Sequence, residues 1–204
     1  MSFETIRIDT DARGVATLWM TRADKHNALS ARMLDDLTAA AGQLGADDTV
    51  RVVVLAAEGK SFCAGGDLAW MREQMDADAA TRRAGASALA GMLNAMNELP
   101  KPLIARCHGN AFGGGVGMLS VCDVAIGAEG AKFGLPEVDR GALGAQICQP
   151  RETHGTHRRA LFHNAAHLRR EARIRDEHLD LRVVDDVRDL VLHQLQVQRH
   201  EHRA

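Results

Sequence analysis

Two glycine-rich segments carry the residues best suited to chemistry. The first, residues 107–117, reads Cys-His-Gly-Asn-Ala-Phe-Gly-Gly-Gly-Val-Gly and lies between two short apolar runs. This order predicts a strand, a glycine turn and the start of a helix. A helix N-terminus presents unpaired backbone N–H groups and the positive end of the helix dipole, and glycines let a ligand approach that backbone closely. We therefore expect this segment to hold an anion, or an oxygen that becomes one.

The glycine spacing does not match the two common phosphate-binding motifs. A phosphate loop needs a lysine after its last glycine, and none follows here. The dinucleotide motif Gly-x-Gly-x-x-Gly would place its last glycine at Met118 or Ser120. A glycine cluster by itself is also compatible with nothing more than close helix packing. A second feature is needed to assign it a chemistry.

That second feature is the segment at residues 58–68, Glu-Gly-Lys-Ser-Phe-Cys-Ala-Gly-Gly-Asp-Leu. It follows residues 50–57, a β-branched run with one charge that predicts a buried strand. We read it as another strand-to-helix turn, with Asp67 near the helix start, where a carboxylate is favoured. Two such turns in one domain can direct two backbone N–H groups at one oxygen, which is the arrangement of an oxyanion hole.

Together with two later motifs, these segments resemble the crotonase (enoyl-CoA hydratase/isomerase) superfamily. The matching text is Ser-Phe-Cys-Ala-Gly-Gly-Asp-Leu at 61–68, His-Gly-Asn-Ala-Phe-Gly-Gly-Gly-Val-Gly at 108–117, Cys-Asp at 122–123 and Lys-Phe-Gly-Leu-Pro-Glu at 132–137. The motifs agree in order and spacing over about residues 3–138. The sequences of these motifs most resemble those of methylglutaconyl- and isohexenylglutaconyl-CoA hydratase-like members. The resemblance implies an α/β fold, a crotonase-like spiral of β-β-α turns.

In this family two peptide N–H groups bind the thioester carbonyl and stabilise the enolate that forms beside it. The resemblance assigns these two groups to Gly66 and Gly114, and proton transfer to Glu137. Hydratases of the family commonly carry a second glutamate, at the position of Gly117 in this chain. Because a glycine can neither orient water nor exchange a proton, the two-glutamate mechanism does not carry over intact.

The resemblance also implies which residues line the passage for the acyl group and coenzyme A. They are Lys25, Ala28, Ala64, Gly65, Gly66, Asp67, Leu68 and Gly114. Lys25 either pairs with a coenzyme A phosphate or is a solvated turn lysine, and Asp67 is expected to act as a helix-start carboxylate. No cofactor is implied beyond the coenzyme A of the substrate. His26 and His108 lack a partner spacing typical of a metal site.

Three functions fit these residues. We expect a lyase that hydrates a 2-enoyl-CoA in fatty-acid or branched-chain/isoprenoid acyl-CoA catabolism. The second reading is an isomerase in which Glu137 alone moves one proton between C2 and C4. The third, from another class, is an acyl-CoA-binding relative without efficient turnover. A nucleotide-phosphate protein is disfavoured by the missing lysine and the failed glycine spacing.

Composition indicates a globular protein that does not bind nucleic acid. The chain has 204 residues, 46% of them hydrophobic, and a net charge of −2, which gives no basic surface for nucleic acid. It has no 18-residue apolar run and no basic-then-apolar leader, so we expect a cytoplasmic protein without membrane contact. The four cysteines form no Cys-x-x-Cys pair and are expected to be free, buried thiols.

The hydrophobic pattern predicts alternating strands and helices. Strands are expected at residues 3–9, 15–20, 50–57, 102–107 and 124–127, and helices at 30–44, 68–75 and 78–98, the first capped by Ser30. We place a crotonase-like acyl-CoA-binding core at residues 1–145 and an atypical segment at 146–204. The C-terminal helical region of the family is therefore expected to be truncated or aberrant.

The atypical segment differs sharply in composition from the core. Residues 151–204 hold 8 of the 10 histidines and 11 arginines but no lysine, whereas all four lysines lie at or before Lys132. Three alternatives explain this change in composition: a reading-frame shift, a divergent tail, and a His-rich tail that binds metal or nucleic acid. We favour the reading-frame shift. Relatives use this region to cover the acyl pocket and to build a homotrimer or a dimer of trimers. We therefore expect the chain as written to be less soluble and weakly active or inactive, and its trimer to be in doubt.

Overall fold

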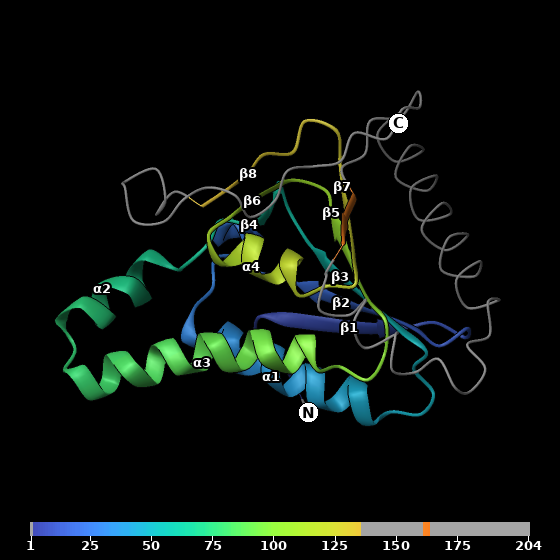
Figure 1. Cartoon of the computed structure of the whole chain (residues 1–204), viewed down its shortest axis with the longest axis horizontal. Helices are drawn as coiled ribbons and strands as arrows, with labels where there is room; N and C mark the ends of the chain where they lie inside the picture. Colours follow the sequence, from blue (N-terminus) through green and yellow to red (C-terminus); the bar gives the residue numbers. More distant parts are fainter. Residues whose placement is uncertain (1, 136–160, 164–204) are drawn as a thin grey trace. The chain divides into compact units, whose positions relative to one another are not determined.

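The computed structural model of the chain describes residues 2–135 and 161–163. Within them the fold is α/β, with one six-stranded and one three-stranded sheet (Figure 1). The larger sheet has the order β1 (Ile6–Thr10), β2 (Val15–Met20), β3 (Val52–Ala57), β5 (Leu103–Cys107), β7 (Val124–Gly127) and β9 (Leu161–His163). The smaller has the order β4 (Ser61–Cys63), β6 (Asn110–Phe112) and β8 (Phe133–Gly134).

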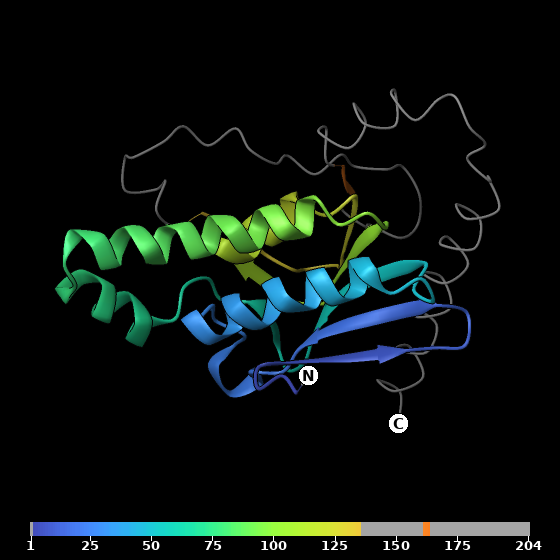
Figure 2. The same cartoon turned by 90° about the horizontal axis from the view of Figure 1, so that it is seen from below.

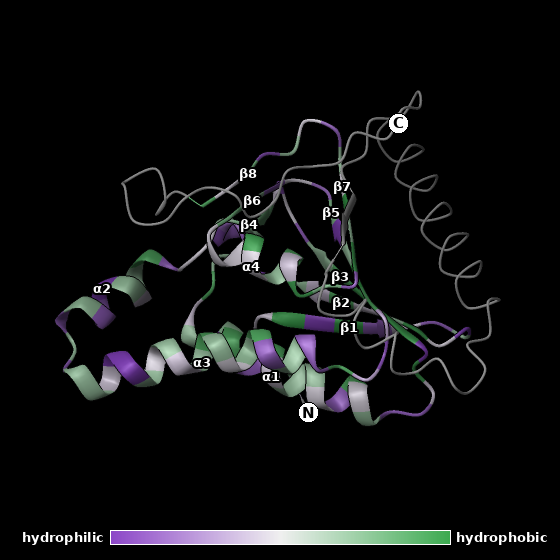
Figure 3. Ribbon diagram, in the orientation of Figure 1, coloured by the Kyte–Doolittle hydropathy of each residue, from purple (hydrophilic) through white to green (hydrophobic). Residues whose placement is uncertain are grey.

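The larger sheet begins with a hairpin and continues with parallel strands. β1 and β2 are antiparallel across a turn at residues 11–14, and β2, β3, β5 and β7 are parallel neighbours, while β9 returns antiparallel to β7. β3 is buried at every position, as its apolar sequence requires for a strand covered on both faces. β1 instead alternates apolar and polar residues (Figure 3), with Ile6 in the core and Arg7 exposed.

Four α-helices are found in the described residues: α1 (Ala31–Ala46), α2 (Leu68–Asp76), α3 (Ala79–Asn97) and α4 (Gly114–Ser120). The Ser30 side chain caps α1 by accepting a hydrogen bond from the Met33 N–H. α1 and α3 run side by side (Figure 2). The apolar face of α1, including Leu34 and Leu37, joins Met92 of α3 and the sheet in one hydrophobic core.

The smaller sheet positions the two glycine turns. β4 pairs in parallel with β6, and β6 with β8. α2 follows β4 after the turn at residues 64–67, and α4 follows β6 after Gly113. Because carboxyl ends of parallel strands meet at one edge of a sheet, the two turns and the two helix starts lie together.

Most predicted elements are confirmed, with corrections at their ends. β2 and β7 have the predicted bounds, whereas β1 starts at Ile6 instead of Phe3 and β3 at Val52 instead of Val50. Each glycine segment leads from a strand through a turn to a helix start, as predicted, but the strand before each turn is a short one, β4 or β6, that was not predicted. β8 and β9 were also not predicted. Apart from β9, the atypical segment at 146–204 lies outside the described residues, and its assignment as a separate region stays a prediction.

Within residues 2–135 and 161–163, no helix is long and apolar enough to cross a membrane.

Candidate functional site

The turn after β4 packs directly on the turn after β6. Gly65 has a φ of +93°, which L-residues with side chains rarely adopt. A Cβ placed on Gly65 would lie 3.2 Å from the Phe112 carbonyl oxygen and 3.8 Å from Cα of Gly113. The backbones of the two turns therefore approach each other at a distance that leaves no room for a side chain, which explains the glycine at this position.

Leu29 connects the two glycines that the sequence assigns as oxyanion donors. Its N–H donates to the Gly65 carbonyl (2.7 Å) and its carbonyl accepts from the Asp67 N–H (2.9 Å), in a parallel bridge opposite Gly66. Its side chain, 1% exposed, lies against Gly114, where an added Cβ would come within 2.5 Å of Cδ1. The structure thus brings Gly66 and Gly114 to the same residue from distant parts of the chain.

The N–H groups of both glycines have no acceptor in the part of the chain that the structure describes. In a parallel bridge the residues flanking the central one make the hydrogen bonds, so the Gly66 N–H points away from Leu29. Gly114 is the first residue of α4, where N–H groups have no acceptor within the helix. Among the described residues, neither N–H donates a hydrogen bond. Both glycines are half-buried.

The loop at residues 22–29 holds the predicted coenzyme A contacts. Lys25 ends a short 3-10 helix and is exposed, whereas Ala28 is buried. His26 and Asn27 both adopt left-handed backbone (φ 51° and 52°). The buried Asn27 amide holds this conformation by donating to the carbonyls of Glu58 (2.8 Å) and Ser61 (2.9 Å). Of the predicted contacts in this loop, Lys25 is the one that meets solvent.

Asp67 is a structural carboxylate, as predicted from its place at the helix start. It is the N-cap of α2, and its Oδ1 accepts from the N–H groups of Ala69 (2.9 Å) and Trp70 (3.4 Å). Its Oδ2 accepts from Nη2 of Arg22 (2.8 Å). The Arg22 hydrogen bond lowers the pKa of Asp67 and outweighs burial, which raises it. Asp67 is therefore ionised at neutral pH and unsuited to donating a proton.

Sequence reasoning missed Arg22. Its guanidinium also donates to the Ala28 carbonyl (2.7 Å), so it joins the loop at residues 22–29 to the start of α2. A single arginine after a strand has no distinctive spacing, and its role appears only when Asp67 is placed beside it. The sole sequence signal was the carboxylate expected at the helix start, which does not by itself identify a cationic partner.

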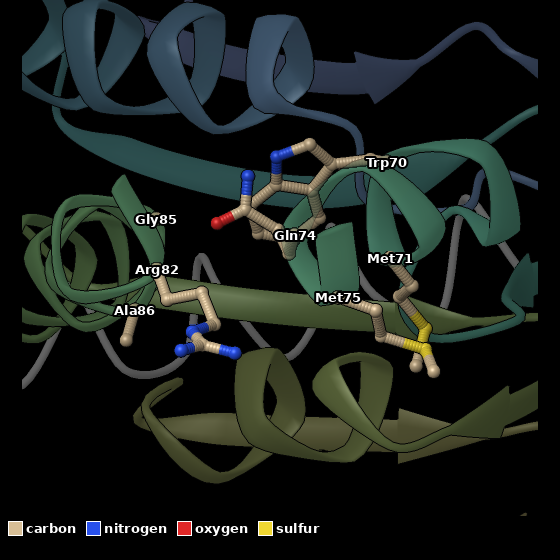
Figure 4. A pocket seen from close by; sticks show the side chains of 7 residues that line it. All are labelled: Trp70, Met71, Gln74, Met75, Arg82, Gly85 and Ala86. Atoms are coloured by element: carbon tan, nitrogen blue, oxygen red, sulfur yellow. The ribbon is translucent and has the colours of Figure 1, made fainter. Parts of the chain in front are cut away.

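An open groove of about 550 Å³ lies between α2 and α3. It is lined by Trp70, Met71, Gln74, Met75, Arg82, Gly85 and Ala86 (Figure 4). The groove adjoins Gly66, because an added Cβ on Gly66 would lie 2.9 Å from Sδ of Met71. The predicted passage residues Ala64, in the turn before α2, and Leu68, the first residue of α2, are both exposed. Apolar surface therefore continues from Gly66 along α2.

Of the two positions at which hydratases of this family carry a glutamate, only one lies in the described residues. Glu137 lies outside them, and its role stays a prediction. Gly117 is half-buried on α4, and an added Cβ would make ordinary contacts of 3.5 Å and 3.7 Å with the Leu93 side chain. The position therefore has room for the start of a side chain. Packing of the described residues therefore does not require a glycine at position 117.

Metal and thiol chemistry find no support in the described part of the chain. It holds no group of three or more His, Cys, Asp or Glu residues that could bind a metal ion. Nε2 of His108 lies 2.7 Å from the Gly59 carbonyl, and Nδ1 of His26 lies 3.2 Å from the Ser61 hydroxyl. Cys63, Cys107 and Cys122 are free and buried, which confirms the prediction for these three. Cys148 lies outside the described residues.

Comparison with known proteins identifies relatives of this chain. The model of the enoyl-CoA hydratase/isomerase family matches residues 10–159. A Mycobacterium bovis protein named "Probable enoyl-CoA hydratase echA8" is 36% identical over 143 residues, which cover 70% of this chain and 53% of the relative. A Mycobacterium tuberculosis (7aS)-7a-methyl-1,5-dioxo-2,3,5,6,7,7a-hexahydro-1H-indene-carboxyl-CoA hydrolase is 38% identical over 140 residues, which cover 69% of this chain and 56% of the relative.

Solved structures agree with the sequence comparison. The crystal structure of an enoyl-CoA hydratase from Shewanella pealeana is similar with a TM-score of 0.66 and 34% identity, covering 70% of this chain and 54% of that one. The enoyl-CoA hydratase of Mycobacterium smegmatis has a TM-score of 0.63 and 38% identity, covering 68% and 53%. The chain spans about half the length of these relatives.

Proposed function

Because the chain belongs to the enoyl-CoA hydratase/isomerase family and has the crotonase fold, we propose that it is an enzyme that binds acyl-CoA thioesters and stabilises an enolate formed beside the thioester carbonyl. The observation that carries the proposal is that Gly66 and Gly114, from distant parts of the chain, both lie against Leu29, with neither N–H bonded among the described residues. Two such donors at one oxygen favour the enolate over the ground-state carbonyl, because the enolate oxygen carries more negative charge.

The reaction we propose is hydration of a 2-enoyl-CoA. Water adds through its oxygen to C3, Glu137 takes the proton that this water loses, and a proton is then delivered to C2 of the enolate. The electrons of the double bond move to the thioester oxygen, where the two glycine N–H groups stabilise them, and return as C2 is protonated. One carboxylate can take and give the proton in turn, so the sequence requires no acid at Gly117.

The acyl group is proposed to extend from Gly66 into the groove between α2 and α3. The side chains of Met71 and Met75 line it from α2 (Figure 4). Unbranched thioether side chains adapt to ligands of varied shape. A branched or extended acyl group fits this surface, which supports catabolism of fatty-acid, branched-chain or isoprenoid acyl-CoAs as the setting. We propose that Lys25, which is exposed, pairs with a coenzyme A phosphate.

A second candidate is double-bond isomerisation, favoured by Gly117. With one carboxylate, Glu137 can remove a proton at one carbon and return it to another through the same enolate, which involves no water. Acyl-CoA binding without turnover is the alternative from another class. Four further points stay predictions. They are that the protein forms a homotrimer, that it works in the cytoplasm, that it needs no separate cofactor and that it has no nucleic-acid partner.

The variant Glu137→Gln tests the function, with Glu129→Gln as control because Glu129 is an exposed glutamate of the same region. Hydration of a 2-enoyl-CoA and double-bond migration in a 3-enoyl-CoA are assayed separately, together with thioester affinity by calorimetry. We expect Glu137→Gln to lower turnover by about 10²- to 10⁴-fold while affinity stays within about threefold, and Glu129→Gln to change neither. Binding without turnover in the unmodified protein would instead identify a non-catalytic relative.

A further inference from the structure

Arg22 closes the loop that leads to the oxyanion site. Its carbonyl accepts from the N–H groups of Lys25 (3.0 Å) and Asn27 (2.9 Å). Its Nη1 donates to the Ala28 carbonyl (2.7 Å). The main chain and the side chain of Arg22 therefore both stabilise the turn at residues 22–28, which Leu29 follows.

The same guanidinium also contacts Asp67, the residue that follows Gly66. Nη2 donates to Oδ2 of Asp67 (2.8 Å), and the two side chains are 21% and 13% exposed, so this ion pair is largely shielded from water. Asp67 is bonded to Leu29 through its own N–H and caps α2 through its other carboxylate oxygen. Arg22 thus touches the residue before Leu29 and the residue after Gly66.

We propose that Arg22 is the positioning residue that fixes the direction of the Gly66 N–H, an inference that rests on the proposed function. The Gly66 peptide lies between two fixed points, the bond from Leu29 to Gly65 and the bond from Asp67 to Leu29. Arg22 contacts the chain beside both bonds, at the carbonyl of Ala28, which precedes Leu29, and at the Asp67 carboxylate. An oxyanion donor must be aimed at the enolate oxygen, and a small misplacement is costly in rate.

Arginine suits this position for two reasons. Its planar guanidinium donates to two acceptors at a fixed angle, whereas a lysine ammonium acts as a single mobile point charge. It also compensates the Asp67 carboxylate, which is one residue from Gly66 and would otherwise oppose negative charge on the substrate oxygen. Loss of Arg22 therefore both loosens the donor and leaves an uncompensated anion beside the enolate.

The test uses the full chain with Arg22→Gln, Arg22→Lys and Asp67→Asn. Arg13→Gln is the matched control, because Arg13 forms a similar pair with Asp11 (2.7 Å) in the exposed turn between β1 and β2. The readouts are kcat and KM for the 2-enoyl-CoA and the amide hydrogen exchange of peptides that contain Leu29 and Asp67. Exchange needs no substrate and reports the two bonds beside Gly66 directly.

We expect Arg22→Gln to lower kcat by about 10- to 100-fold with KM within about threefold, and to speed exchange at Leu29 and Asp67. Arg22→Lys should recover part of kcat, and Arg13→Gln should match the unmodified protein. If Arg22→Gln does not fold, Asp67→Asn gives the same test, since it keeps an oxygen for the helix cap but loses the ion pair; a several-fold lower kcat is expected.

Three results would overturn the inference. One is a normal kcat in Arg22→Gln or, if that variant does not fold, in Asp67→Asn. Another is a kcat loss without faster exchange at Leu29 and Asp67, and the last is an effect on KM alone. In each case the unmodified enzyme still turns over, so the proposed function stands. An unmodified protein that neither binds nor converts acyl-CoA contradicts the proposed function, and the role of Arg22 falls with it.

Discussion

A Cβ placed on Gly115 would lie 2.8 Å from the Cβ of Cys63 and 2.9 Å from the Cys63 carbonyl oxygen. Gly115 is the second residue of α4, and Cys63 is the last residue of β4. Both are buried. The helix that carries Gly114 therefore packs on the strand that precedes Gly66, and packing requires a glycine at the last position of the triplet.

Gly115→Ala should force α4 away from β4. Because the obstacle includes the Cys63 backbone, relaxation is costly, and we expect the free energy of unfolding to fall by about 1–3 kcal/mol. Gly91→Ala in α3 is the control, since nothing lies within 4 Å of its added Cβ and a helix favours alanine by up to about 1 kcal/mol. Urea denaturation measures both. Equal effects of the two substitutions would show that α4 does not pack on β4 as described.

Gly117→Glu should restore a second carboxylate where the packing has room for it. The first carbon of the side chain makes only ordinary contacts with Leu93. If Glu137 works alone, a second acid–base group that orients water should raise hydration about tenfold or more relative to double-bond migration. Gly117→Gln is the control for side-chain size. A hydration-to-migration ratio that is unchanged, or equal in both variants, would contradict this reading.

Asp36 should carry part of the acid sensitivity of the fold. It is 4% exposed and accepts from the N–H groups of Glu4 (3.1 Å) and Thr5 (3.0 Å) and from the Thr5 hydroxyl (2.8 Å). Burial by itself raises the pKa of Asp36, but these hydrogen bonds and Arg32 outweigh it, so the pKa lies below the ordinary value. The stabilisation is complete above the unfolded pKa of about 4 and is lost as pH falls through the lower folded value.

Asp36→Asn should therefore lower the free energy of unfolding by about 1–3 kcal/mol near neutral pH and flatten its fall below about pH 4. Asp35→Asn, an exposed neighbour on the same helix, should do neither. Denaturant titrations near neutral pH and at about pH 3 measure the difference. An acid dependence that survives in Asp36→Asn would assign it to other carboxyl groups.

The buried cysteines should resist alkylation while the chain is folded. Burial raises the pKa of the Cys63 thiol to about 11 and that of Cys107 to about 12, and it also raises the pKa of Cys122. At about pH 8 the thiolate fraction of Cys63 is about one in a thousand, and thiolate is the reactive form. In a Cys148→Ser background, labelling by iodoacetamide should require denaturant. Rapid labelling without denaturant would show that this core opens.

The parts of the fold that follow local rules could be predicted from the sequence. Ser30 and Asp67 have the side chains that cap helices, and both do so. The apolar run of β3 predicts a buried strand and forms one. β4 and β6 were missed because strands of three residues, rich in small side chains, have too short a pattern to show a period.

The site could be predicted only in part, because its contacts join distant residues. The glycine motifs located Gly66 and Gly114, but nothing in the sequence shows that Leu29 lies between them. The bridge from Leu29 to Gly66 and the ion pair from Arg22 to Asp67 depend on how the loop at residues 22–29 folds back on the turn after β4. Such pairings are set by tertiary packing and not by local propensity.

The central claim is that the Gly66 and Gly114 N–H groups polarise a thioester carbonyl. It is tested most directly by difference infrared spectroscopy of an enoyl-CoA labelled with carbon-13 at its carbonyl. The account predicts that the carbonyl band of the bound thioester shifts to lower frequency than in water, because two aligned hydrogen bonds weaken the C=O bond. Binding with a carbonyl band unchanged from water, or no binding at all, would contradict it.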